Sequence, residues 1–370
     1  MKTFTFITMI FVSSITNALE IKFPADFFAE QISGAQCITH VRWRYDEKGI
    51  ASLDANKMME HNTSLAVTHN ELSYRWSNIL SKTYTAIAKN DLDGIKDVIK
   101  TLLFIAERNA LLNTKNVEGK CWQDGNKNAK CGYHTMQHTG FAFNAMVMSA
   151  TTIKEHLTKD ELNVLNIYFK KGYEKFIEPN AIAPLNSKGI YEFADNGISV
   201  LAYAHWTNDK KLAERELKRR HKDWLKKISD YGLLNQNSYR GHRSYWYHTL
   251  GANSVFGYAL IAREFGWDFF TDSELGPKLR ALAESVYAGD RDIKVFLDLP
   301  FSAKNAIKDI KDARHHMHQL SLGLPIILKN EYNMLVGNNP IYQHKSSRET
   351  VDRQTGFNAE CYYSSIKKID

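Results

Sequence analysis

The feature that most restricts the fold is an alternation between two kinds of helical segment. From residue 91 onward, apolar residues recur at helical spacing, and poorly charged segments alternate with strongly charged ones. The poorly charged segments are 134–152, 191–206 and 243–264, and the charged ones are 159–177, 209–229 and 273–288, with further helices expected at 91–112 and 303–328. Such alternation is typical of an inner layer of helices covered by a solvated outer layer. We therefore predict an all-α fold, an incomplete α/α toroid of helical hairpins.

The N-terminus has the pattern of a signal peptide. Lys2 precedes a mostly apolar run over residues 4–15, which is too short to span a bilayer, and the small residue Ala18 follows. We expect residues 1–18 to be removed and residues 19–370 to form a single domain. The mature protein is then expected in the periplasm or outside the cell.

Four cysteines fit an oxidising compartment, namely Cys37, Cys121, Cys131 and Cys361. Three pairings are possible. Cys121 and Cys131 flank a polar stretch that a disulfide could close, and Cys37 with Cys361 would join the two ends of the domain. Metal binding is the weaker interpretation, because the spacing matches no common zinc pattern. We expect disulfides, with no metal and no cofactor.

The richest concentration of functional side chains lies in residues 237–257. Within nine residues it holds three aromatic rings, two imidazoles and two guanidinium groups: Tyr245, Trp246, Tyr247, His242, His248, Arg240 and Arg243. Flat rings stack on sugars, cations bind carboxylates, and imidazole titrates near neutral pH. We interpret the stretch as the first turns of a helix at a polysaccharide site. The alternative is a buried aromatic helix whose cations reach the surface.

The net charge of +7 suits a polyanionic partner, which could be nucleic acid, an anionic membrane or an acidic glycan. The basic run 217–227 is most simply a solvated face, so we expect neither a nucleic-acid partner nor a membrane partner. We also expect the protein to be a monomer. Residues 38–62 include HVRWRYDEKG, where basic and aromatic residues alternate around Arg44. This segment is either a lid over an anionic substrate or a solvated loop.

The sequence RGHRSYWYHTLGANSVFGYAL, residues 240–260, resembles the helix of alginate lyases that carries an Asn-Asn-His-Ser-Tyr-Trp motif. Ser244, Tyr245 and Trp246 match its second half, whereas Gly241-His242-Arg243 replaces Asn-Asn-His. Related mannuronan and glucuronan lyases take the neutralising asparagine from the preceding inner helix, where Asn196 stands here. The resemblance to this superfamily implies an α/α-toroid polysaccharide lyase. Such an enzyme cleaves alginate (poly-mannuronate) or glucuronan by metal-independent β-elimination and leaves 4,5-unsaturated uronate ends.

This chemistry requires a group that neutralises the uronate carboxylate, a base for the C5 proton and an acid for the leaving oxygen. We assign neutralisation to Asn196 and Arg243, and the base to His242, which could instead share in neutralisation. The acid is Tyr247 by preference and Tyr245 next, and the same tyrosine is a second candidate for the base. His248 is expected to support the tyrosine.

Other residues are expected to bind the substrate. By the same resemblance, Arg314 corresponds to an arginine of a later inner helix, and His316 or His318 stands near it in place of a tyrosine. His134 and Gln137 begin an inner helix and either line sugar subsites or cap the helix. The complete set of predicted binding residues is Arg314, His318, Trp246, Arg240, Tyr239, His134, Gln137 and Arg44.

Two other functions remain open at this stage. A glycoside hydrolase on the same architecture would need two carboxylates on either side of the scissile bond, and Glu192 and Asp195 are the nearest pair. They lie close together on one helix, which suits opposed roles poorly. A non-catalytic binder of acidic glycans would keep the arginines and aromatic rings without needing a proton-transfer pair.

Overall fold

The computed structural model describes residues 20–23, 75–112, 120–123, 126–130, 132–182, 190–300, 323–337 and 359–366. The regular elements within them are α5 (Arg75–Ala88), α6 (Leu92–Glu107), β1 (Lys120–Gln123), β2 (Asn126–Lys130), α7 (Gly132–Thr152), α8 (Lys159–Gly172), α9 (Glu178–Ile182), α10 (Ile190–Thr207), α11 (Lys210–Lys227), α12 (Ser244–Glu264), α13 (Leu275–Arg291), α14 (Lys294–Leu297), α16 (Gly323–Tyr332) and α17 (Ala359–Ile366).

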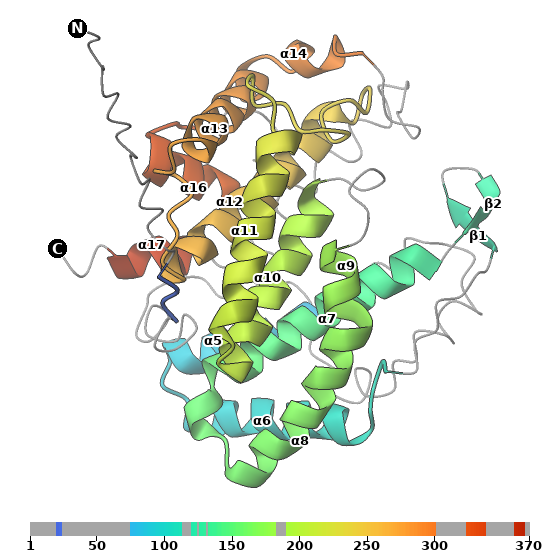
Figure 1. Cartoon of the computed structure of the whole chain (residues 1–370), viewed down its shortest axis with the longest axis vertical. Coiled ribbons are helices and arrows are strands. Elements are labelled where there is room, and N and C mark those ends of the chain that lie inside the picture. Colours follow the sequence, from blue (N-terminus) through green and yellow to red (C-terminus); the bar gives the residue numbers. More distant parts are fainter. Residues whose placement is uncertain are drawn as a thin grey trace, which may run out of the picture.

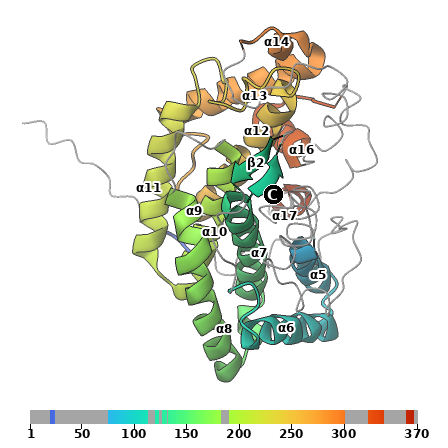
Figure 2. The ribbon, with the colours of Figure 1, turned by 90° about the vertical axis from the view of Figure 1, so that its right-hand side faces the viewer.

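The helices form the two layers that the alternation predicts. The poorly charged helices α7, α10 and α12 lie side by side with α10 in the middle, and α11 and α13 pack against their outer sides (Figure 1, Figure 2). Residues 139–152 of α7 and 251–262 of α12 are buried on every side. A helix without a polar face must be enclosed by other elements. The predicted all-α toroid architecture is confirmed.

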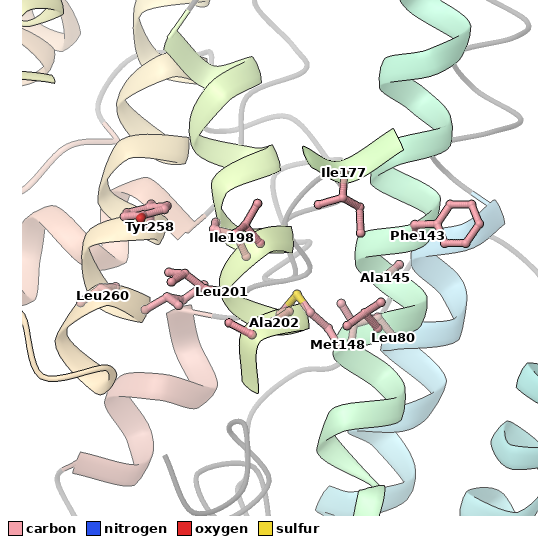
Figure 3. Close-up of a cluster of buried hydrophobic side chains, with 14 of the residues drawn as sticks. Leu80, Phe143, Ala145, Met148, Ile177, Ile198, Leu201, Ala202, Tyr258 and Leu260 are labelled. Carbon is pink, nitrogen blue, oxygen red and sulfur yellow. The ribbon is translucent and has the colours of Figure 1, made fainter. Parts of the chain in front are cut away.

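One continuous apolar core joins these helices. Met148 of α7 reaches toward Ala202 of α10, while Leu201 of α10 lies on the side of α12 (Figure 3). Burying a side chain such as leucine or isoleucine contributes roughly 1.5–3 kcal/mol. The interfaces between α7, α10 and α12 therefore supply much of the stability of the domain.

Several boundaries differ from the prediction. The segment predicted as one helix over 159–177 is α8 followed by a π-helical turn, Tyr173–Ile177, after which α9 begins. The polar stretch between Cys121 and Cys131 contains a two-stranded antiparallel hairpin, in which Lys120 pairs with Lys130. Its strands are short and lack apolar alternation, so no sequence pattern predicts them.

Other expectations fall outside the described residues. These are the signal peptide, the lid segment 38–62 and most of the helix expected at 303–328, of which only the end coincides with α16. The cysteine side chains also lie outside them, so the disulfides stay a prediction. Among the described helices, none has a stretch that is long and apolar enough to cross a membrane.

Helix α11 corrects the interpretation of residues 217–227 as a wholly solvated face. Glu216, Arg220, Asp223 and Lys227 are buried and alternate in charge along one side of the helix. Arg220 donates to Glu216 Oε1 over 3.0 Å from Nε and 2.7 Å from Nη2, and Lys227 Nζ lies 3.2 Å from Asp223 Oδ2. Pairing at i and i+4 lets these charges enter the interior without leaving a net charge there.

The C-terminal end of α12 is fixed by segments from both ends of the chain. The Lys22 N–H donates to Phe265 O over 3.0 Å, and Tyr362 Oη donates to Glu264 Oε1 over 2.9 Å. Arg263 makes a bidentate pair with Glu331 at 2.9 and 2.8 Å. The C-terminal end of α12 is therefore closed, while the N-terminal end carries the partly exposed residues Trp246 and Tyr247.

That N-terminal end depends on a close approach to α13 at Gly289. A Cβ atom there would lie 2.4 Å from Tyr245 Cε2 and 2.6 Å from Phe296 Cε2, well inside van der Waals contact. We expect Gly289→Ala to lower the free energy of unfolding by about 1–3 kcal/mol, because the added methyl overpacks this interface. Chemical denaturation measures the change.

The matched control is Glu284→Ala, which truncates an exposed side chain on the same helix. It should change the unfolding free energy by no more than about 0.5 kcal/mol. Equal stability of Gly289→Ala and the wild-type protein would show that α13 does not depend on this contact.

Candidate functional site

The candidate site is built on the connection between α11 and α12, residues 228–243. The connection folds back on itself, with Ile228 and Leu234 forming a β-bridge and the Asn235 N–H donating to Lys227 O over 3.0 Å. Gly232 has a φ of +72° and fits against α13, where a Cβ atom would lie 2.1 Å from Ala281 O. Glycine tolerates both conditions, so the loop is held on the surface of α13.

The chain enters α12 through a tight turn. Gly241 has a φ of +62°, and the Arg240 N–H donates to Ser244 Oγ over 2.8 Å. The Asn237 side-chain amide donates to Tyr247 O over 2.9 Å. These bonds tie the loop to the first turn of the helix, so the residues between them are held in one arrangement.

Five predicted site residues lie partly exposed around this turn, namely Tyr239, His242, Arg243, Trp246 and Tyr247. The Arg240 guanidinium lies over the Tyr247 ring at 4.0 Å from the centroid, and the Tyr247 and Trp246 rings are 4.3 Å apart. A cation at this distance is attracted to the ring face. Arg240 is itself almost buried, so it orients the Tyr247 ring.

The surroundings favour an anion. Arg243 occupies the N-cap position of α12, at the positive end of the helix dipole, and the Arg240 guanidinium lies over the ring of Tyr247 in the first turn. His242 Nδ1 is buried and has no hydrogen-bond partner among the residues that the structure describes. A buried polar atom without a partner is costly, and a hydrogen bond from a ligand would remove that cost.

The turn also removes a geometric difficulty of the prediction. In one regular helix, His242 and Tyr247 would lie on different faces. In the structure α12 begins at Ser244, so His242 and Arg243 belong to the turn before it. The directions of their side chains are therefore not set by the helical geometry that places Trp246 and Tyr247.

Tyr245 has a different environment from the other predicted residues. It is 1% exposed, its Oη donates to Val286 O over 3.2 Å, and its ring lies 5.2 Å from that of Phe296. It packs α12 against α13 and α14. A phenol in this position does not reach solvent.

His248 is completely buried between two serines. Its Nδ1 lies 2.9 Å from Ser238 Oγ in the loop, and its Nε2 lies 2.8 Å from Ser285 Oγ on α13. Burial lowers the pKa of His248 to about 3, since a charged imidazole would lose its hydration there. The ring is neutral at ordinary pH.

The hydrogen bonds of the two serines fix which nitrogen of His248 carries the proton. Ser285 Oγ donates to the carbonyl of Leu282 or Gly232, at 2.8 and 3.2 Å, so it accepts from His248 Nε2–H. Ser238 Oγ accepts from the Leu234 N–H over 2.8 Å and donates to Nδ1. With this tautomer, every N–H and O–H in this series of hydrogen bonds has an acceptor. His248 thus joins the loop to α13.

The remaining predicted residues are placed only in part. Asn196 lies in α10, the helix beside α12, and His134 and Gln137 lie in the first turns of α7, but their side chains are outside the described part of the chain. Arg314, His318 and Arg44 lie outside it altogether.

Sequence reasoning missed the residues that hold the loop. Asn237, Ser238 and Ser285 donate or accept bonds that fix it, yet Ser285 stands 37 positions from His248 in a helix assigned to the outer layer. No local pattern marks such a serine. Only the folded structure brings it to the imidazole.

His248→Gln should flatten the dependence of stability on pH. The folded pKa of about 3 lies below the unfolded value of 6.5, so the neutral ring contributes stability that is fully present above pH 6.5 and is lost as the pH falls toward 3. The upper limit of this loss is about 5 kcal/mol, at 1.36 kcal/mol per pKa unit. Denaturation curves from pH 7 to pH 4 measure it.

Glutamine does not titrate, so the variant should lose less stability over this range than the wild-type protein. His156→Gln, which changes an exposed histidine, serves as the control and should leave the pH dependence within about 0.5 kcal/mol. Parallel wild-type and His248→Gln curves would contradict a buried neutral His248.

Comparison with known proteins gives a match in structure and none in sequence. No family model and no curated protein sequence matches the chain. Alginate lyase A1-III from Sphingomonas species A1 superposes with a TM-score of 0.56 at 10% identity, covering 91% of this chain and 97% of that one. A histidine-to-alanine variant of alginate lyase A1-III complexed with tetrasaccharide gives 0.56 at 11% identity, covering 84% and 86%. A tyrosine-to-phenylalanine variant, also with tetrasaccharide, gives 0.51 at 11% identity, covering 84% and 74%. The chain therefore shares the α/α-toroid fold of alginate lyase A1-III.

Proposed function

We propose that this protein is a polysaccharide lyase that cleaves a uronic-acid-containing polysaccharide, alginate or glucuronan, by metal-independent β-elimination. The observation that carries the proposal is the group of polar and aromatic side chains at the start of α12, in which the nearly buried Arg240 guanidinium lies over the partly exposed Tyr247 ring at 4.0 Å. The fold shared with alginate lyase A1-III supports it, as do the tetrasaccharide complexes of those proteins. The signal-like residues 1–18 are consistent with action in the periplasm or outside the cell.

The reaction removes the C5 proton of a uronate and breaks the C4–O bond. The proton is very weakly acidic as long as the neighbouring carboxylate keeps its full negative charge. Arg243 at the N-cap of α12 and the positive end of the helix dipole are suited to bind that carboxylate. Asn196, from the adjacent helix α10, is assigned to the same neutralisation of the carboxylate.

Proton transfer is assigned to the two partly exposed candidates, Tyr247 and His242. Tyr247 is the acid that protonates the leaving oxygen, and Arg240 holds its ring. His242, whose Nδ1 has no partner among the described residues, is the base. Tyr245 and His248 do not transfer protons in this proposal, because both are buried with their polar atoms engaged. They hold the first turn of α12 in place.

The test of the proposed function is the ultraviolet absorbance of the unsaturated uronate product. The purified protein is incubated with poly-mannuronate, poly-guluronate, glucuronan and hyaluronan, and the absorbance is followed over time. A rise with at least one polymer is expected. Chain shortening without absorbance would indicate a hydrolase, and binding without either would indicate a glycan-binding protein.

Tyr247→Phe should lower kcat by about 10²–10⁴-fold, because it removes only the hydroxyl that donates the proton. The ring remains over Arg240, so KM should change little. Steady-state absorbance assays on the polymer identified above measure both constants.

Tyr231→Phe is the matched control, since it removes a hydroxyl from an exposed tyrosine in the same connection. It should keep the wild-type kcat. A Tyr247→Phe variant with full turnover would rule out Tyr247 as the acid, and His242→Gln tests the base in the same way.

A further inference from the structure

Helix α11 sorts its charges between its two sides. Every exposed residue on this helix is basic, and these residues are Lys210, Lys211, Arg215, Lys218, Lys222 and Lys226. Of its three acidic residues, Glu216 and Asp223 are buried and Glu214 is half-buried. The outside of the helix is therefore almost purely cationic.

The buried acids do not offset this outer charge. Glu216 pairs with Arg220 at 2.7 Å, and Asp223 pairs with Lys227 at 3.2 Å, so each buried acid is matched by a buried base. The inner side is neutral as a whole, and the exposed cations give α11 a large share of the net charge of +7. Solvated charges of one sign on one face attract counter-ions or a polyanion.

Five of the exposed cations form a single row. Lys211, Arg215, Lys218, Lys222 and Lys226 are separated by four, three, four and four positions, which places them on one face of the helix. The row is about 22 Å long at 1.5 Å per residue. Helix α11 lies along the outside of the molecule for its whole length (Figure 1, Figure 2).

Most of this row is not neutralised by neighbours. Arg215 lies 3.1 Å from Glu178 and Lys218 lies 2.6 Å from Glu214, and both pairs are partly solvated. In the part of the chain that the structure describes, Lys211, Lys222 and Lys226 have no carboxylate within 4.0 Å.

We propose that this row, the cationic face of α11, is a second binding surface for a linear acidic glycan, separate from the site at the start of α12. The Cβ atoms of neighbouring residues in the row stand about 5–6 Å apart, close to the length that one pyranose ring adds to an extended chain. A polyuronate has one carboxylate per ring and matches this spacing. Duplex nucleic acid carries one charge per about 1.7 Å, far more densely than the row.

The position of the row relates it to the candidate site. Lys226 lies at the C-terminal end of α11, directly before the connection 228–243 that carries the site residues, and the Asn235 N–H bonds to Lys227 O. A polyanion lying along α11 would be led toward that connection. The choice of glycan rests on the proposed function, whereas binding of a polyanion by the row does not.

The experiment compares two triple variants of the full chain. Lys218→Glu, Lys222→Glu and Lys226→Glu reverse the row, and Lys89→Glu, Lys96→Glu and Lys100→Glu reverse three exposed lysines near or on α6. Both change the net charge from +7 to +1, since each substitution subtracts two charges. Affinity for immobilised poly-mannuronate is measured against salt concentration, with Tyr247→Phe in every protein so that the polymer stays intact.

The α11 variant should bind at least about tenfold more weakly at low salt. Its slope of log affinity against log salt should be smaller by about 2, at roughly 0.7 per lost contact for a single-stranded polyanion. The α6 variant should bind like the parent. Equal losses in both variants would overturn the proposal, as would tighter binding to duplex DNA or to anionic lipid vesicles than to the glycan.

A second measurement separates this proposal from the proposed function. With Tyr247 intact, the α11 variant should cleave short oligosaccharides at the wild-type rate and show a raised KM on long polymer. If neither the wild-type protein nor any variant cleaves a polymer, the proposed function fails. The binding comparison then still tests whether the cationic face of α11 binds the glycan. Wild-type affinity of the α11 variant for poly-mannuronate would overturn the cationic face alone.

Discussion

The structure depends on the complete burial of α12. Residues 251–262 have no exposed side, because α10, α13 and α16 surround the helix and residues 20–23 pair with the chain at its end. A helix enclosed in this way can present functional groups only at its ends. The C-terminal end is closed by the Arg263–Glu331 pair, so the cations, rings and imidazole gather at the N-terminal end, where the helix dipole also favours an anion.

The polar groups inside the protein hold the charged and catalytic candidates in position without adding net charge to the interior. His248 is neutral and gives both ring nitrogens to serines, which costs less than burying an imidazolium. In α11, the two opposite charges of each buried ion pair likewise cancel. In both cases the inner polar atoms fix the position of an element, while the outer or terminal residues of that element remain available to a ligand.

How far the sequence predicts the site is clearest from Tyr245 and Tyr247. Both carry the same phenol and stand two positions apart, and both are candidates for the acid that protonates the leaving oxygen. The sequence favours Tyr247 and does not exclude Tyr245, because the burial of Tyr245 comes from Phe296 and Val286, more than forty positions away. His242 and His248 differ for the same reason. Local sequence identifies the groups, and distant contacts decide which of them reach solvent.

The layered helical architecture follows from the amino-acid sequence alone, since a helix with apolar residues all round must be inside and one rich in lysine must have an outer side. The place where the functional groups concentrate follows from it too. Folding settles which side of α11 is cationic, which tyrosine is accessible and which nitrogen of His248 is protonated. Each of these depends on partners such as Ser285 that meet the residue only after folding, and helical periodicity carries no information about a partner on another helix.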